Sequence, residues 1–332
     1  MSDSRYDVVG IGNAIVDVIA RCDDAFLSKH SLHKGHMRLI TAGEADTLYS
    51  QMGQGRETSG GSVANSCAGL ASFGASAAFI GRVADDQLGR IFSHDISSIG
   101  VAYNTPPSNM GLPTARCLIL VTPDGERTMN TFLGASTELS SEDIDLETIA
   151  SAQLTYLEGY LFDKPDAKEA FHAAARLARG AHRKVALSLS DAFCVDRHRA
   201  DFLNLIREGV DVLFANETEI TSLYQVNSFE EAVAASRGEA GIVVLTRSAN
   251  GSVILSGRDT IELAAEPVAE VVDVTGAGDL YSAGFLFGLA RGKTLEACGR
   301  LGGLAASEII GHIGARPEVG LAALARQKGY LS

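Results

Sequence analysis

Short apolar runs that alternate with helical segments are the feature that most constrains the fold of this chain. The runs are bounded by glycine or polar residues, which is typical of buried strands. Because consecutive parallel strands need a crossover helix between them, this order predicts a parallel sheet with helices on both faces. The expected strands are 6–12, 77–81, 154–157, 185–189, 212–215 and 241–246. The expected helices are 66–73, 86–95, 166–179, 199–209, 217–224, 228–238, 280–291, 294–310 and 318–327.

Two stretches interrupt the alternation. Residues 115–121 and 127–133 flank a Thr-Pro-Asp-Gly-Glu segment whose Pro and Asp-Gly are strong hairpin signals. Residues from about 18 to 40 are polar and mixed, without a helical period, although Asn13–Asp17 continues the first apolar run as strand. We therefore expect a small β lid made of about 15–40 and 112–136, inserted in one domain that spans 1–332. A second hairpin is expected at 251–255 and 260–263.

Composition excludes several classes of partner. The 332 residues suit one large α/β domain or two small ones. A net charge of −13 argues against nonspecific binding to nucleic acid or anionic membranes. No apolar run approaches the ~20 residues of a membrane helix, and the five cysteines are scattered without metal-ligand spacing. These features predict a cytoplasmic protein with reduced thiols and no membrane partner.

Residues 273–279 read Asp-Val-Thr-Gly-Ala-Gly-Asp and precede a helix. Two glycines around one alanine let the backbone turn tightly and expose its N–H groups at the positive end of that helix, which forms an anion site. Asp279 falls in the first helical turn, where it can take a proton from a hydroxyl that attacks a phosphate. From these residues alone, an ordinary turn with a capping Asp remains the alternative.

This string resembles the second signature of the ribokinase-like (PfkB) carbohydrate and nucleoside kinases. The resemblance covers essentially the whole chain, because further motifs follow in the family's order. It implies a ribokinase-like, three-layer α/β/α fold with a doubly wound, mainly parallel sheet and a small β lid. It also implies a kinase with an alcohol acceptor that uses ATP and Mg²⁺. In this family the amides at Gly276, Ala277 and Gly278 form the anion hole, and Asp279 is the catalytic base.

Two motifs are similar to the family's acceptor-binding elements. Gly-Gly-Ser-Val-Ala-Asn at 60–65 resembles the first signature, and Gly-Asn-Ala-Ile-Val-Asp at 12–17 resembles the start of the adenosine-kinase branch. An Asn supplies a donor and an acceptor for vicinal hydroxyls, and an Asp that ends an apolar strand needs a partner. A turn or cap for Asp17 and a surface hairpin position for Arg127 are the alternatives. The resemblance implies substrate binding by Asn13, Asp17, Gly60, Gly61, Asn65 and Arg127.

Further motifs concern the nucleotide and cations. Asn216 and Glu219 match the family's Asn-x-x-Glu element near the metal-bound phosphates, which implies that Glu219 binds Mg²⁺ through water. The same spacing is also a capping box. Residues 245–251 correspond to the family's nucleotide loop, although Ser248 replaces its first glycine. Family members also bind a monovalent cation, such as K⁺, near positions like Asp273 and Thr275, where a turn is the alternative. The implied nucleotide-binding residues are Asn216, Thr246, Arg247 and Gly251.

The motifs at 12–17, 189–193 and 214–219 favour a nucleoside acceptor. Tyr160, Phe162 and Phe193 could enclose a purine, or belong to the core. We expect transfer of the γ-phosphoryl of ATP to the 5′-hydroxyl of a nucleoside, adenosine first, in purine salvage by a monomer or homodimer. A ribokinase- or fructokinase-like sugar kinase is the alternative. A catalytically dead nucleotide-binding module is disfavoured because Asp279 is intact, and the missing third glycine after 10–12 excludes a dinucleotide fingerprint.

Overall fold

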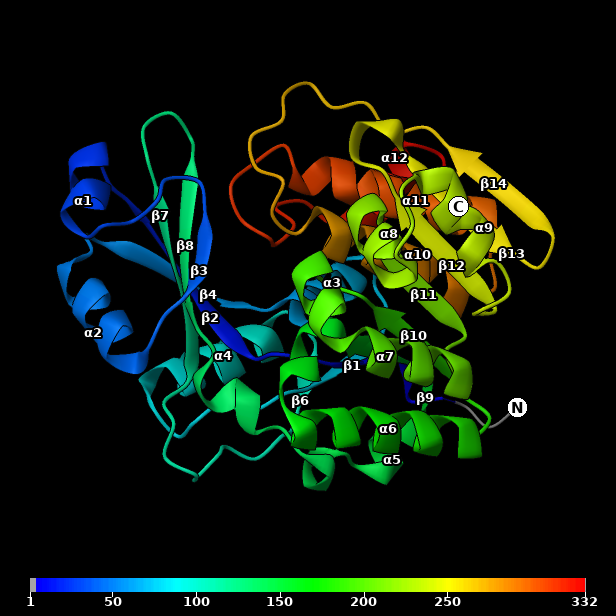
Figure 1. The fold of residues 1–332 in the computed structure, drawn as a ribbon, viewed down its shortest axis with the longest axis horizontal. Coiled ribbons are helices and arrows are strands. Elements are labelled where there is room, and N and C mark those ends of the chain that lie inside the picture. The colour runs from blue at the N-terminus through cyan, green and yellow to red at the C-terminus, as the bar shows by residue number, and fades with distance from the viewer. Residues whose placement is uncertain (1–3, 332) are drawn as a thin grey trace.

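The computed structural model describes residues 4–331 and contains a large sheet with helices on both faces and a small sheet beside it (Figure 1). β1 lies inside the large sheet and pairs in parallel with β5 and β9. Only the β12–β13 and β13–β14 pairs of this sheet are antiparallel among the described residues. The strands in spatial order are β14 (Asp259–Leu263), β13 (Ser252–Ser256), β12 (Ile242–Thr246), β11 (Val212–Asn216), β10 (Lys184–Ser188), β9 (Ala152–Glu158), β1 (Tyr6–Ile11), β5 (Ala77–Ile80) and β6 (Ala102–Tyr103).

Successive side chains of the large-sheet strands point to opposite faces, and helices cover both faces, so both are buried. In β1, Val8 enters one apolar core while Val9 and Ile11 enter the other. The first core is covered by α3 (Ser62–Ser72), α4 (Gln87–Ser98), α10 (Ala277–Ala290), α11 (Leu295–Ile309) and α12 (Leu321–Gln327). The second is covered by α5 (Leu146–Ala150), α6 (Pro165–Gly180), α7 (Ala192–Gly209), α8 (Glu217–Tyr224) and α9 (Phe229–Ser236). This arrangement confirms the predicted three-layer α/β/α fold.

The small sheet is separate from the large one and contains the predicted hairpin. β7 pairs antiparallel with β8, and neither strand pairs with the large sheet within residues 4–331. One face packs against α1 (Asp24–Lys29) and α2 (Ala42–Gln51) through Leu27, Leu48 and Leu118. The strands in spatial order are β3 (Met37–Leu39), β8 (Arg127–Phe132), β7 (Ala115–Val121), β2 (Ile15–Arg21) and β4 (Gly55–Gly60).

The structure differs from the sequence predictions mainly between residues 12 and 72. The chain does not continue β1 through residues 13–17 but leaves the large sheet after Ile11, and β2 enters the small sheet. α1, β3, α2 and β4 were not predicted, and β4 lies outside the two segments expected to form the lid. α3 begins at Ser62, four residues earlier than expected, because Gly61 turns the chain into the helix with a φ of 105°.

Within residues 4–331, short 3₁₀ segments connect these elements at η1 (Gly134–Glu138), η2 (Ser141–Asp143), η3 (Gly159–Asp163) and η4 (Ser248–Asn250). None of the helices described between residues 4 and 331 is long and apolar enough to cross a membrane.

Candidate active site

Asp279 lies in the first turn of α10 and is held by α3. Its carboxylate accepts hydrogen bonds from Ser62 Oγ (2.6 Å) and Asn65 Nδ2 (2.9 Å). Ser66 Oγ donates to the Asp279 carbonyl (2.9 Å). Burial raises the pKa of Asp279, whereas these hydrogen bonds and the Arg316 guanidinium oppose the rise. The structure therefore brings Asn65 of the first motif and Asp279 of the second into direct contact.

Asn65 has an unused acceptor beside this carboxylate. Its Nδ2 donates to Asp279, while its Oδ1 is buried without a hydrogen-bond partner among the described residues. A buried acceptor that lacks a donor costs about 1–3 kcal/mol. A hydroxyl group that enters beside Asp279 would satisfy this oxygen.

The glycine turn before α10 has the geometry of an anion site. Gly276 has a φ of 80°, a conformation that other residues adopt only at a cost. The Ala277 N–H donates to the Val274 carbonyl (3.2 Å), so this predicted amide is used inside the turn. The amides of Gly276 and Gly278 donate to no oxygen of residues 4–331. These two N–H groups stand at the positive end of α10 and can bind a phosphoryl oxygen.

Asp17 lies on β2 with its carboxylate against the Gly60–Gly61 turn. A Cβ atom at Gly60 would lie 2.4 Å from Asp17 Oδ2, so this glycine makes room for the carboxylate. Burial raises the pKa of Asp17 to about 6, against the lowering effects of Arg316 and Arg127. No described residue donates a hydrogen bond to this carboxylate. Because this carboxylate is only partly exposed and no described residue donates to it, the position suits a ligand that carries hydroxyl groups.

Glu158 was not predicted, and it anchors two of the predicted elements. Asn13 donates to Glu158 Oε1 through Nδ2 (2.7 Å) and its backbone N–H (3.3 Å), and the Val63 N–H donates to Oε2 (2.9 Å). Burial raises the pKa of Glu158 to about 7. The Asn13 amide nitrogen is thus used within the protein rather than left for a ligand. The sequence signal was present, since Glu158 is a charged residue that ends an apolar strand, as Asp17 was taken to be.

The hairpin of the small sheet contacts the turn before α10 through a buried ion pair. Arg127 at the start of β8 pairs with Asp273, and both side chains are almost fully buried. Asp273 also accepts hydrogen bonds from the backbone N–H groups of Thr275 (3.0 Å) and Gly314 (2.9 Å). Arg127 therefore already balances the carboxylate near which a monovalent cation was predicted. Arg127 Nε has no hydrogen-bond partner among the described residues.

We expect Arg127→Ala to lower kcat by about 10²-fold, because it removes a cationic donor beside the anion turn. Breaking a buried ion pair also costs about 3–5 kcal/mol of stability. Arg38→Ala is the matched control, since Arg38 lies half-exposed on β3 of the same sheet. Steady-state kinetics and equilibrium binding of adenosine without ATP, both below the melting temperature, check this expectation. Equal losses of kcat and of adenosine affinity would make Arg127 an ordinary binding residue.

The capping-box alternative for Asn216 and Glu219 is present in the structure. The Asn216 N–H and Nδ2 donate to the two oxygens of Glu219 (3.0 and 2.6 Å), and the Glu219 N–H donates to Asn216 Oδ1 (2.9 Å). Burial raises the pKa of Glu219 to about 7, and the charges of Asp191 and Asp279 add to this effect. Both carboxylate oxygens are thus engaged, and magnesium binding through water remains a prediction. Residues 4–331 contain no cluster of three or more metal-ligating His, Cys, Asp or Glu side chains.

The other predicted nucleotide residues lie at the end of β12 and in the turn that follows it. Thr246 pairs with Asn216 in the sheet register. Arg247 forms an ion pair with Glu217 (3.3 Å) and stacks over the Phe229 ring, and Gly251 turns the chain with a φ of 80°. Thr246 and Asn216 end the adjacent strands β12 and β11, and the Asp279 charge acts on Glu219 in the turn after Asn216. A ligand that lies along these carboxyl ends would therefore reach both the nucleotide residues and Asp279.

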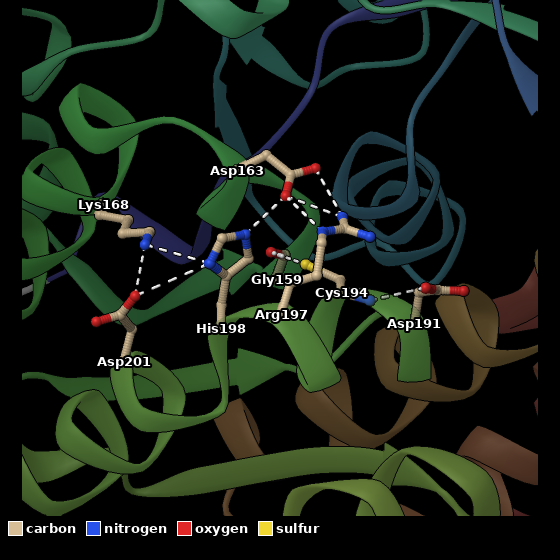
Figure 2. A network of polar contacts seen from close by, with 8 residues as sticks. All are labelled: Gly159, Asp163, Lys168, Asp191, Cys194, Arg197, His198 and Asp201. Carbon is tan, nitrogen blue, oxygen red and sulfur yellow. Dashed lines mark hydrogen bonds and ion pairs between the residues drawn. The ribbon is translucent and has the colours of Figure 1, made fainter.

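The start of α7 is held against η3 by polar contacts (Figure 2). Asp163 binds Arg197 Nη2 (2.9 Å) and His198 Nε2 (2.7 Å), while Lys168 binds Asp201 (2.5 Å). This network ties α7, which follows β10, to η3 and α6, which follow β9. Of the three aromatic residues considered for a purine, Phe162 lies in the core against Phe202, so that interpretation is wrong for Phe162. Tyr160 and Phe193 are exposed.

Comparison with known proteins identifies the family. The model of the pfkB family carbohydrate kinases matches residues 7–319. The chain belongs to the pfkB family of carbohydrate kinases. The solved structure of a probable sugar kinase from Rhizobium etli CFN 42 has a TM-score of 0.92 and 50% identity, over 99% of this chain and 100% of that one. The adenosine kinase from Sinorhizobium meliloti has a TM-score of 0.91 and 51% identity, over 98% and 100%.

A curated relative agrees with this assignment. Adenosine kinase 1 of Arabidopsis thaliana is 25% identical over 340 residues, which cover 93% of this chain and 96% of that protein. The pfkB chain is thus a kinase that phosphorylates a hydroxyl group, and its structure resembles an adenosine kinase. Its structural neighbours carry both adenosine-kinase and sugar-kinase names, so the family alone leaves the acceptor open.

Proposed function

We propose that this kinase transfers the γ-phosphoryl of ATP to the 5′-hydroxyl of a nucleoside, with adenosine as the first candidate, in purine salvage. The observation that carries the proposal is the arrangement of Asp17, Asn65 and Asp279. Two carboxylates and one amide oxygen lie around the Gly60–Gly61 turn, and neither Asp17 nor Asn65 Oδ1 has a hydrogen-bond donor among residues 4–331. Neighbouring ribose hydroxyls would supply the missing donors.

The mechanism follows from the groups at the turn. Asp17 and Asn65 bind the 2′- and 3′-hydroxyls, which directs the 5′-hydroxyl toward Asp279. Asp279 takes the proton of that hydroxyl as the hydroxyl oxygen attacks the γ-phosphorus of ATP, whose bond to the β,γ-bridging oxygen breaks to release ADP. The amides of Gly276 and Gly278 bind the charge that develops on the phosphoryl oxygens. The small sheet serves as a lid of the single kinase domain and excludes water that could otherwise accept the phosphoryl.

The residues near the predicted phosphate site fit magnesium bound through water. Mg²⁺ favours one or two carboxylates together with waters and substrate phosphates. The charge of Asp191 adds to the raised pKa of Glu219, and the two residues follow the adjacent strands β10 and β11, so they can hold waters of such an ion. When bound, the ion would neutralise charge on the transferring phosphates. Arg127 already neutralises the Asp273 carboxylate, so we do not assign K⁺ to that carboxylate.

The surface next to Asp17 supports an acceptor with an apolar base. In the small sheet, Ile19, Ile119, Met129 and Met37 form a row across the strands, one pleat from Asp17 on the same face. Met37 is 52% exposed, and Leu39 on that face is 59% exposed. The opposite face is covered by α1 and α2, so this face is the one available to a ligand. A nucleobase would cover this apolar face, whereas a free sugar would leave it exposed to water.

A sugar kinase is the second candidate, because the probable sugar kinase from Rhizobium etli is as similar to this chain as the adenosine kinase from Sinorhizobium meliloti. The test is the identity of the product. The protein is incubated with adenosine, ATP and Mg²⁺, and ³¹P NMR locates the new phosphate ester. We expect adenosine 5′-monophosphate. A product esterified at the 2′- or 3′-position, or phosphorylation of ribose or fructose without any nucleoside product, would overturn the proposal.

A further inference from the structure

Arg316 lies in the loop 310–320 after α11 and turns its guanidinium inward onto β4 and α3. Nη2 and Nε donate to the Ser59 carbonyl (2.6 and 2.9 Å), and Nη2 also reaches Ser59 Oγ (2.8 Å). Nη1 donates to the Ala64 carbonyl (2.7 Å). Because Ser59 precedes the Gly60–Gly61 turn and Ala64 follows it, one planar guanidinium bridges the two sides of this turn.

The same loop touches the glycine turn before α10. The Gly314 N–H donates to Asp273 (2.9 Å), and Ala315 packs against Gly276, where an added Cβ would lie 2.9 Å from the Ala315 Cβ. Three consecutive residues of the loop therefore contact both turns. Residues 314 and 315 contact the expected phosphoryl site, and Arg316 contacts the expected acceptor site.

Arg316 is also the cation among the carboxylates of the site. It makes no direct ion pair with a described residue, since its hydrogen bonds go to carbonyl and hydroxyl oxygens. Its charge lowers the pKa of Asp17 and of Asp279. Asp95 completes the arrangement, because it accepts hydrogen bonds from the Ser59 N–H (2.8 Å) and Oγ (2.6 Å). The three carboxylates near Arg316 therefore all contact the Gly60–Gly61 turn or its neighbours: Asp95 at Ser59, Asp17 at Gly60 and Asp279 at Ser62.

Resting on the proposed function, we propose that Arg316 is a positioning residue for the acceptor: it holds the Gly60–Gly61 turn between Asp17 and Asp279 and ties it to the turn before α10. None of the predicted motifs contains this residue. Its loss would release the turn, so acceptor binding would weaken more than ATP binding. Its loss would also remove a positive charge beside the two carboxylates.

The expected pH effect follows from the groups around Asp17 and Arg316. Without the Arg316 charge, the pKa of Asp17 rises, and the acid limb of kcat/KM for the acceptor moves to higher pH by about one unit. A lysine would keep the charge but could not bridge both carbonyl groups, so it separates the two effects. The titratable and charged groups that face this pair are Arg127 from β8, Cys117 from β7, Cys67 from α3, Asp95 from α4 and Asp279 from α10.

The test compares Arg316→Gln and Arg316→Lys with Arg300→Gln, a control on the exposed side of α11 whose partner is Glu296. With adenosine as the acceptor, we expect KM for adenosine to rise at least tenfold in both Arg316 variants, while KM for ATP changes less than threefold. The acid limb should move up only in Arg316→Gln. Amide hydrogen exchange of residues 59–65, measured without substrates, should become faster in both variants and stay unchanged in Arg300→Gln.

These outcomes separate the inference from the proposed function. If the wild-type protein phosphorylates no nucleoside, the proposed function fails, and the exchange of residues 59–65 still tests whether Arg316 holds the turn. If the wild type phosphorylates adenosine and both Arg316 variants keep its KM and pH profile, only the role of Arg316 is overturned. Equal rises in both KM values, or failure of both variants to fold, would make Arg316 a purely structural residue and would also overturn the inference.

Discussion

Asp279→Asn should lower kcat by about 10²–10⁴-fold and leave the affinity for the acceptor nearly unchanged. The amide cannot take the proton of the attacking hydroxyl, and this is the largest effect that we expect of a single substitution. The variant should fold, because the new amide can keep both contacts of the carboxylate. Its Oδ1 can accept from Ser62, and its Nδ2 can donate to Oδ1 of a rotated Asn65. The Asn65 Nδ2 then faces the acceptor and donates to the same hydroxyl, which can accept as well as donate, so acceptor affinity is kept.

Asp7→Asn is the matched control for this variant. Asp7 is a buried, hydrogen-bonded carboxylate near the start of β1 that pairs with Arg291 at the C-terminal end of α10, whereas Asp279 lies in the first turn of that helix. Its substitution should affect the melting temperature rather than kcat. Steady-state kinetics and thermal melts of both variants check the expectation. Wild-type kcat in a folded Asp279→Asn variant would remove Asp279 from the mechanism.

The second large effect is expected at Asp17. Asp17→Ala should lower kcat/KM for adenosine by about 10²-fold, because a hydrogen bond to a charged group contributes about 1.5–3 kcal/mol. It should also erase most of the preference for adenosine over 2′-deoxyadenosine, since a site built to bind a hydroxyl discriminates strongly against its absence. The measurement is kcat/KM for both nucleosides with wild type and variant. A preference that survives in the variant would place the hydroxyl contact elsewhere.

Asp124→Ala supplies the control, because Asp124 is an exposed carboxylate at the hairpin tip of the same sheet and pairs with Lys34.

The pH dependence of kcat/KM gives a second test of the role of Asp17. Its pKa is raised to about 6, and the ionised form binds the hydroxyls, so kcat/KM for adenosine should fall as the pH drops below about 6. In Asp17→Ala this contribution to the acid limb should disappear, whereas in Asp124→Ala it should persist.

The large sheet could be predicted because its strands are buried on both faces and therefore appear as continuous apolar runs. β1 and β11 are examples. The small sheet was predicted as a lid made of two segments, but only its hairpin was predicted strand by strand. β3 is exposed along its whole length, and the six residues of β4 are all polar or glycine with the first two exposed, so neither has an apolar run that would indicate a strand. Their position depends on pairing with β8 and β2 rather than on local sequence.

The residues of the candidate site likewise fall into those that a local motif predicts and those whose contacts are distant in the chain. Asp279 and Asn65 could be proposed because each stands in a short motif with a local physical meaning, and the structure brings them into contact. Glu158 and Arg316 act on residues 145 and 257 positions away in the chain, so local spacing carries no sign of their contacts. Arg127 shows that two residues from separate motifs can contact each other although neither motif predicts that contact. Its ion pair with Asp273 links two residues that were assigned to a substrate and to a cation separately.

The most direct test of the nucleoside assignment is a comparison of kcat/KM at fixed ATP and Mg²⁺ for adenosine, guanosine, inosine, 2′-deoxyadenosine, ribose and fructose. The account predicts that adenosine gives the highest value, that 2′-deoxyadenosine is markedly poorer, and that free ribose is poorer still because it cannot cover the apolar face beside Asp17. A free sugar with a kcat/KM above that of every nucleoside would contradict the nucleoside assignment and leave a sugar kinase of the same family.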